Sequence, residues 1–323
     1  MPSQIGLRKL PAMPRPIRAL ALICVLAPAA RAQEPTPGRL VAVTIDDLPV
    51  TGPVTRAWGS ITTQLLDALA RYEVPAVGFV NENRLHPNGR LDSARVRLLA
   101  AWLAAGHELG NHTYSHRSAH ATPLPQYLDE IERGDIVTRA LTRRAGRPLR
   151  YFRHPQLHAG RTLAYRRAVE QFLAERGYTI APVTVDNQEW VYAAAYVVAR
   201  RRGDTTLAGK VVADYLRHLD HAFAYSESLA RATLGREIPL VLLLHANELN
   251  ADHLDVVLRA IRARGYRFAP LDAVLADSAY RSADEYVGPR GLSWLQRWAL
   301  TRGHTPPAEP REERYVAELA GAR

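Results

Sequence analysis

The chain has 323 residues, with 42 Lys or Arg against 32 Asp or Glu, and a formal net charge of +10. Five of the basic residues and no acidic ones lie in residues 1–32, so residues 33–323 carry only a modest positive excess, which argues against nucleic-acid binding. Cys24 is the only cysteine, so disulfides, thiolate metal ligands and a cysteine nucleophile are excluded for residues 33–323.

Residues 1–32 have the pattern of a secretory signal peptide. Basic residues precede an apolar stretch at 19–30, and a small-x-small pattern, Ala30-Arg31-Ala32, comes directly before Gln33. The stretch is too short to span a bilayer as a permanent helix. We therefore expect a cleaved signal peptide, a periplasmic or secreted protein and no stable membrane span after cleavage. An uncleaved N-terminal anchor is the alternative.

Beyond this leader, short apolar runs alternate with amphipathic stretches of helical spacing. The runs predict strands at 40–45, 74–80, 108–111, 149–152, 179–185, 240–244 and 266–269. The amphipathic stretches predict helices at 61–72, 94–105, 127–142, 163–176, 251–264 and 271–276. Repeated strand–helix units of this kind indicate an α/β fold, either a barrel or a doubly wound parallel sheet.

Two segments interrupt this alternation. Residues 190–237 lie between two predicted strands and are interpreted as a helical insertion, with helices at 192–202 and 210–221. His218 and His221 fall on the second helix and are expected to face solvent. The segment 291–323 predicts one short helix, followed by a tail rich in Pro and charge.

Polar residues follow the predicted strands at the point where each ends. They are Asp46 and Asp47 after residue 45, Arg153 after 152, Asp186 after 185 and His245 after 244. The carboxyl ends of parallel barrel strands are where active sites lie.

The adjacent acids Asp46 and Asp47 and the pair His112/His116 together could bind a divalent metal and leave one carboxylate free as a base. Each feature has an ordinary explanation. Two acids after a strand can cap a helix or pair with an arginine. The H-x-x-x-H spacing also recurs at His116/His120 and His154/His158, so spacing alone does not define a site.

The order of motifs is more specific than any one of them. The chain contains T-I-D-D, A-G-H-E-L-G-N-H-T-Y-S-H, F-R-H-P, V-D-N-Q-E-W and L-V-L-L-L-H, in that order. This series resembles the polysaccharide deacetylases of carbohydrate esterase family 4, which are defined by the NodB homology domain. The resemblance extends over 39–276. It implies a distorted (β/α)7-type barrel, with a deacetylase domain at 33–290 and the insertion around 190–237.

The resemblance also implies roles. Asp47, His112 and His116 correspond to the ligands of one divalent metal, usually Zn²⁺, with Co²⁺, Ni²⁺ or Mn²⁺ as other candidates. Asp46 corresponds to the general base and His245 to the general acid. The remaining correspondences are Arg153, which orients the base, the backbone N–H of Gln156, which stabilises the oxyanion, and Trp190 and Leu243, which line the acyl pocket.

Two motifs depart from the family pattern. Gln156 stands where an aromatic residue is usual, so an aromatic wall for the sugar is either missing or supplied by Trp190, Tyr192 or Tyr196. The usual D-x-x-D-W is replaced by residues 186–190, D-N-Q-E-W. The carboxylate that tunes His245 is therefore Glu189 or Asp186.

These features predict an exported, metal-dependent deacetylase that hydrolyses N-acetyl or O-acetyl groups of a carbohydrate. An amidase acting on small linear or cyclic amides with the same fold is one alternative. A non-catalytic carbohydrate-binding protein of the cell envelope is the other.

Overall fold

The computed structural model describes residues 1–3, 6 and 39–322. The predicted signal peptide lies outside the described residues, apart from positions 1–3 and 6, and stays a prediction. Among the residues that are described, no helix is both long and apolar enough to cross a membrane.

A seven-stranded parallel sheet, with β1 in its interior, organises the fold. Its order is β5-β4-β3-β2-β1-β6, and β7 pairs with the start of β1. The apolar residues of β1 after Leu40 are buried, as expected for a strand covered on both faces. The strands are β1 (Leu40–Leu48), β2 (Ala76–Val80), β3 (Glu108–Asn111), β4 (Tyr151–Phe152), β5 (Thr179–Ile180), β6 (Leu240–His245) and β7 (Arg267–Phe268).

The segment that begins with β5 joins the two edges of this sheet. β5 pairs with β4 at one edge, and Val185 forms a bridge with Leu242 of β6 at the other. The backbone N–H of Leu243 donates to the carbonyl of Val185 at 3.1 Å. The sheet is therefore curled into a distorted barrel, which confirms the predicted fold class.

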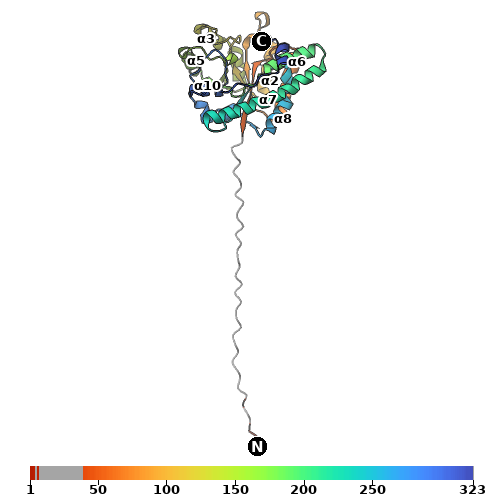
Figure 1. The fold of residues 1–323 in the computed structure, drawn as a ribbon, viewed down its shortest axis with the longest axis vertical. Coiled ribbons are helices and arrows are strands. Elements are labelled where there is room, and N and C mark those ends of the chain that lie inside the picture. The colour runs from red at the N-terminus through yellow and green to blue at the C-terminus, as the bar shows by residue number, and fades with distance from the viewer. Residues whose placement is uncertain (4–5, 7–38, 323) are drawn as a thin grey trace. The chain divides into compact units, whose positions relative to one another are not determined.

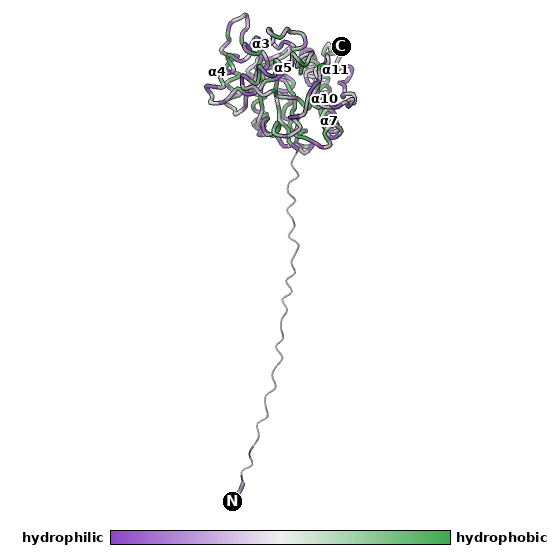
Figure 2. The backbone as a smooth tube through the Cα atoms, turned by 90° about the vertical axis from the view of Figure 1, so that its left-hand side faces the viewer, coloured by the Kyte–Doolittle hydropathy of each residue, from purple (hydrophilic) through white to green (hydrophobic). Residues whose placement is uncertain are grey.

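Helices surround the sheet, with α3 and α5 on one side of the view in Figure 1 and α6 on the other. In Figure 2, segments of hydrophobic residues gather in the interior of the folded part, while segments of hydrophilic residues lie mostly at its periphery. The α-helices are α1 (Trp58–Arg71), α2 (Ser93–Ala104), α3 (Leu124–Arg133), α4 (Ile136–Arg144), α5 (Leu163–Glu175), α6 (Glu189–Arg201), α7 (Thr205–Leu234), α8 (Glu248–Ala263), α9 (Leu271–Leu275), α10 (Trp294–Thr301) and α11 (Arg314–Ala320). The short 3₁₀ turns are η1 (Glu82–Leu85), η2 (Pro87–Gly89), η3 (Pro155–Leu157) and η4 (Ser278–Arg281).

The single helix predicted at 127–142 is wrong, because the segment forms two helices, α3 and α4, separated at Gly134. A Cβ placed on Gly134 would lie 2.6 Å from the carbonyl carbon of Thr113. Only glycine allows this close approach, so the break lets the chain pack against the loop that carries the histidine pair.

The predicted insertion is helical, but its helices are longer than the sequence indicates. α7 runs for 30 residues and ends at Gly235, which adopts a left-handed conformation. His218 is 5% exposed and packs against Tyr192, so the expectation that it faces solvent is wrong, while His221 is exposed as expected.

The C-terminal segment packs onto the insertion. α10 contacts α7, and the unforeseen helix α11 contacts α6. The Tyr315 hydroxyl donates to Asp214 Oδ2 at 2.6 Å, and the Tyr225 hydroxyl donates to the carbonyl of Pro307 at 3.0 Å. The C-terminal segment is therefore part of the same compact unit as the barrel.

Candidate active site and metal centre

A cavity of about 560 Å³ opens at the carboxyl ends of β1 and β6. It brings together nine of the residues predicted from sequence: Asp46, Asp47, His112, His116, Gln156, Asp186, Trp190, Leu243 and His245. The two other predicted residues, Arg153 and Glu189, lie behind this lining and bind Asp46 and His245.

The backbone of β1 explains how two adjacent acids both face the cavity. Successive residues of a regular strand point to opposite faces. The register between β1 and β2 shifts between Ile45 and Leu48, and Asp47 has a left-handed φ of 66°. This irregularity redirects the side chain of Asp47, as bulges beside active sites do.

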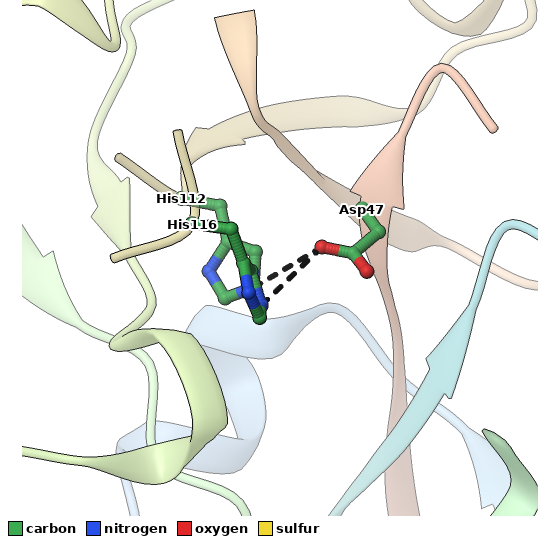
Figure 3. Close-up of side chains that lie close together, drawn as sticks. All are labelled: Asp47, His112 and His116. Atoms are coloured by element: carbon green, nitrogen blue, oxygen red, sulfur yellow. Dashed lines mark ion pairs between the residues drawn. The ribbon is translucent and has the colours of Figure 1, made fainter. Parts of the chain in front are cut away.

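Asp47, His112 and His116 form a cluster with the donors that a divalent metal requires (Figure 3). One ligand atom from each residue lies within 4.8 Å of the other two. Asp47 Oδ1 is 3.7 Å from His112 Nε2 and 3.5 Å from His116 Nε2. Two imidazoles and one carboxylate are a common catalytic zinc ligand set that leaves a coordination position open.

The two oxygens of Asp47 have different surroundings. Oδ2 accepts a hydrogen bond from the Thr51 hydroxyl at 3.0 Å and lies 3.5 Å from Arg84 Nη2. Oδ1 is buried and has no hydrogen-bond partner among the described residues. A buried unpaired carboxylate oxygen is costly, so the atom that faces the histidines suits a bound cation.

The histidine pair lies on a tight turn after β3 and not on a helix. Thr113 and His116 have left-handed φ values of 66° and 59°. Glu130 stabilises the turn by accepting hydrogen bonds from the N–H of Ser115 at 2.7 Å and from its hydroxyl at 2.8 Å. Strained residues of this kind persist where the surrounding structure holds them, commonly at functional sites.

His112 is oriented for metal binding. Its Nδ1 lies 2.8 Å from the carbonyl oxygen of Arg153, so Nδ1 carries the proton and Nε2 presents a lone pair toward Asp47. Burial lowers the pKa of His112 to about 4, which keeps the ring neutral. Burial by itself would raise the pKa of Asp47, but the adjacent histidines and Arg84 lower it well below its usual range. The three residues therefore fit a divalent metal in both geometry and protonation.

Asp46 is held by a fully buried arginine. Arg153 Nη1 donates to Asp46 Oδ1 at 3.2 Å, while its Nε and Nη2 donate to the carbonyl of Ala181 and the hydroxyl of Thr44. Asp46 Oδ2 also lies 3.5 Å from His112 Nε2. The second carboxylate of the doublet is thus fixed beside the metal cluster and paired with a permanent positive charge.

His245 and Asp46 are direct register partners across β6 and β1, so they sit side by side on the sheet. His245 Nδ1 lies 2.8 Å from Glu189 Oε2, and Asn247 donates to the other oxygen of Glu189. Burial alone would lower the pKa of His245, but the hydrogen bond and charge of Glu189 outweigh it and raise the pKa to about 9. His245 is therefore protonated at neutral pH.

Of the two carboxylates proposed as partners of His245, Glu189 makes the hydrogen bond. Asp186 accepts a hydrogen bond from the backbone N–H of Gln188 at 3.1 Å, and burial raises its pKa. Asp186 still lines the cavity.

Gln156 is exposed at the cavity rim, on a turn where it and Leu157 both have a φ of 55°. Gly291 of the C-terminal segment supports this turn, because a Cβ placed on it would lie 1.8 Å from the carbonyl oxygen of Gln156. Trp190 is 50% exposed in the cavity lining. Tyr192 and Tyr196 are buried away from it, so the expectation that either forms a wall for the sugar is wrong.

The other histidines near the motifs do not join the metal cluster. His120 and His158 stack with ring centroids 3.9 Å apart, and the Ser118 hydroxyl lies 2.7 Å from His158 Nδ1. His154 lies in the loop between β4 and η3, is 2% exposed and contacts the Tyr127 hydroxyl.

Several residues at the site could not be singled out from sequence. Thr51 and Arg84 bind Asp47, Asn247 binds Glu189, and Gly291 contacts the Gln156 turn. The one local signal for any of them is the position of Asn247, two residues after His245 at the end of a strand. The structure shows that Asn247 caps α8, accepting from Asn250 N–H at 3.0 Å, and also lines the cavity.

Comparison with known proteins finds a matching family model. Residues 33–181, which contain the acid doublet, the histidine pair and Arg153, match the family model described as polysaccharide deacetylase. This match to the polysaccharide deacetylase model agrees with the resemblance that the motifs indicate. No curated protein sequence matches it.

Solved structures of a polysaccharide deacetylase and of two carbohydrate esterase family 4 proteins are similar to the chain at low sequence identity. A polysaccharide deacetylase from Bacillus cereus is 19% identical over 72% of this chain and 91% of its own, with a TM-score of 0.48. A family 4 carbohydrate esterase from Streptomyces lividans is 24% identical over 72% of this chain and 92% of its own, with a TM-score of 0.43. A family 4 pseudoenzyme from Bacillus anthracis is 18% identical over 74% of this chain and 66% of its own, with a TM-score of 0.48.

Proposed function

We propose that this protein is an exported, metal-dependent hydrolase that removes N-acetyl or O-acetyl groups from a carbohydrate. The observation that carries the proposal is the pairing of a metal-binding cluster, Asp47, His112 and His116, with a flanking base and acid. The match to the polysaccharide deacetylase model supports the reaction class. The N-terminal sequence pattern supports export.

Asp47, His112 and His116 would hold one divalent ion, with Zn²⁺ as the first candidate and Co²⁺, Ni²⁺ or Mn²⁺ as others. Such an ion supplies Lewis-acid polarisation of water and of the acyl carbonyl when bound. Asp46, fixed by Arg153, accepts the proton of the attacking water. His245, held protonated by Glu189, donates a proton to the leaving nitrogen or oxygen.

The reaction balances as a hydrolysis. A bond forms between the water oxygen and the acyl carbon, and the bond from that carbon to nitrogen or oxygen breaks. One proton of the water goes to Asp46 and the proton of His245 goes to the leaving group, which yields a carboxylic acid and a free amine or hydroxyl. The acid then loses its proton to solvent, and the proton on Asp46 replaces the one that His245 gave up. The N–H of Gln156, at the exposed turn of the rim, would donate to the developing oxyanion.

The second candidate function is hydrolysis of small linear or cyclic amides. The observation that favours it is the helical wall that α6 adds to the cavity, with Trp190 and Val197 in the lining. A walled cavity suits a small substrate better than an open groove does. Turnover of free small amides without release of acetate from any oligosaccharide would select this alternative.

The test is acetate release by residues 33–323 loaded with Zn²⁺ or Co²⁺. Chitooligosaccharides, acetylated xylan and peptidoglycan are compared, beside an Asp46→Asn control. We expect release from at least one polymer and a loss of roughly 10²–10⁴-fold in the control, the usual contribution of one acid or base. An unchanged rate in the control would overturn the mechanism, and no release from any substrate would favour a non-catalytic role.

A further inference from the structure

One face of α6 forms an apolar stripe along the cavity. Trp190, Ala193, Ala194 and Val197 line it at the i, i+3, i+4 and i+7 spacing that places residues on one side of a helix. Trp190 is 50% exposed, whereas Val197 is 2% exposed. The stripe thus has its most exposed residue at Trp190 and its most buried one at Val197, with two small alanines between them.

The opposite face of α6 anchors this stripe. Tyr196 donates its hydroxyl hydrogen to Asp252 Oδ2 of α8 at 2.8 Å, and Tyr192 packs against Tyr215 of α7. Glu189, the first residue of α6, binds His245. The helix therefore holds the stripe at a fixed position relative to the acid that acts on the leaving group.

Polar and apolar groups lie on different parts of the cavity lining. Hydroxyl and amide side chains are contributed by Thr51, Gln156, Gln188 and Asn247, outside the stripe. A sugar placed against the stripe would leave its hydroxyls without partners, which is costly. The acyl group is the apolar part of an acylated carbohydrate, and it is the part that the stripe can bind.

Resting on the proposed function, we infer that the same site also hydrolyses acyl groups longer than acetyl, with the chain of the acyl group along the α6 stripe. Seven helical residues separate Trp190 from Val197, a rise of about 10 Å, which an extended chain of roughly eight carbons matches. An acetyl group would leave the stripe uncovered beyond Trp190. The substrate class therefore extends from acetylated sugars to sugars acylated with a medium-length chain, and the hydrolysis itself is unchanged.

The first test varies the substrate at both ends. The Zn²⁺-loaded protein is assayed on p-nitrophenyl esters from acetate to octanoate, and on acetate esters of alcohols with lengthening alkyl chains. We expect kcat/KM to rise about threefold to fourfold per buried methylene in the acyl series and to stay flat in the alcohol series. A rise confined to the alcohol series would place the leaving group on the stripe and overturn the inference.

The second test changes the stripe. Ala194→Phe should lower the ratio of octanoate to acetate kcat/KM at least tenfold, and Val197→Ala should raise the preferred chain length. Ala213→Phe, on an exposed position of α7, is the matched control and should leave the ratio unchanged. Equal effects on both esters in the two stripe variants would contradict the inference.

A binding measurement separates this inference from the proposed function. Calorimetry with acetate, butyrate and octanoate should give affinities that rise with chain length in the wild type and not in Ala194→Phe. Release of acetyl groups without any effect of chain length would contradict this inference and leave the proposed function standing. Absence of turnover on every ester, with chain-length-dependent binding, sinks the proposed function and retains the stripe as an acyl-binding site.

Discussion

The cavity has two walls that are built by opposite means. The wall at the ends of β1, β3 and β4 carries buried charge, including Asp46, Asp47 and Arg153, each held by several polar partners. The wall formed by α6 is apolar and is held by packing against α7, α8 and α11. Buried charges tolerate little change because an unpaired ion is costly, whereas apolar contacts are lost in small steps. We therefore expect chemistry to be fixed at the first wall and substrate choice to vary at the second.

Among the substitutions that distinguish the two walls, Arg153→Met should have the largest effect. The change leaves the buried carboxylate of Asp46 without its counter-charge, which costs about 3–5 kcal/mol of unfolding free energy. Urea denaturation of the metal-free protein measures it. Arg133→Met, which breaks an exposed ion pair with Asp129, is the control and should cost less than about 1 kcal/mol. Adding Asp46→Asn to Arg153→Met should restore part of the loss, and failure to do so would contradict the explanation.

Gly291→Ala should have the next largest effect, because the new Cβ would collide with the backbone of the Gln156 turn. Displacing this turn moves the proposed oxyanion donor, and misplacement by about 1 Å can cost on the order of 10²-fold in kcat. Steady-state kinetics measures the loss, while the affinity for Zn²⁺ should be unchanged.

The control for this change is Gly209→Ala in α7, where nothing lies within 4 Å of an added Cβ. It should stabilise the protein by up to about 1 kcal/mol and leave kcat unaltered. Similar kinetics for the two alanine variants would show that Gly291 does not position the turn.

A smaller effect is expected from Glu189→Gln on the pH profile. His245 must be protonated to donate, so activity is present below its pKa and is lost as pH rises through it, near 9. A cation bound by Asp47 lowers the pKa of His245. The alkaline limb of the pH profile of the metal-loaded enzyme therefore lies at or below pH 9. Replacing Glu189 removes the group that raises the pKa, and the alkaline limb of kcat/KM should move at least one pH unit lower. Asp186→Asn should move it less, and equal shifts would mean that both carboxylates tune His245.

The smallest effect should come from the α6 side, through Tyr315→Phe. This change removes the hydrogen bond that joins α11 to Asp214 of α7 and should cost about 1 kcal/mol of unfolding free energy. kcat for acetyl release should stay within about twofold of wild type. A large loss of activity would mean that the helical wall, like the strand wall, controls the chemistry.

The sequence predicted the strand wall far better than the helical one. Asp46, Asp47 and His245 could be found because each follows an apolar run, and parallel strands bring such ends together. Periodicity also gave the strands and most helices, but it missed the break at Gly134, which depends on a close approach to Thr113. Thr51, Arg84 and Gly291 act through contacts that no local pattern records. The sequence also does not indicate which face of α6 lines the cavity, because this depends on how the helix packs against its neighbours.

The position of β1 has a consequence for synthesis. This strand emerges first, yet its partner β6 follows only after about 200 further residues, so one of its edges stays unpaired for most of translation. An apolar strand with a free edge is a template for aggregation. A chaperone that covers residues 40–48 until β6 has been made would reduce this hazard.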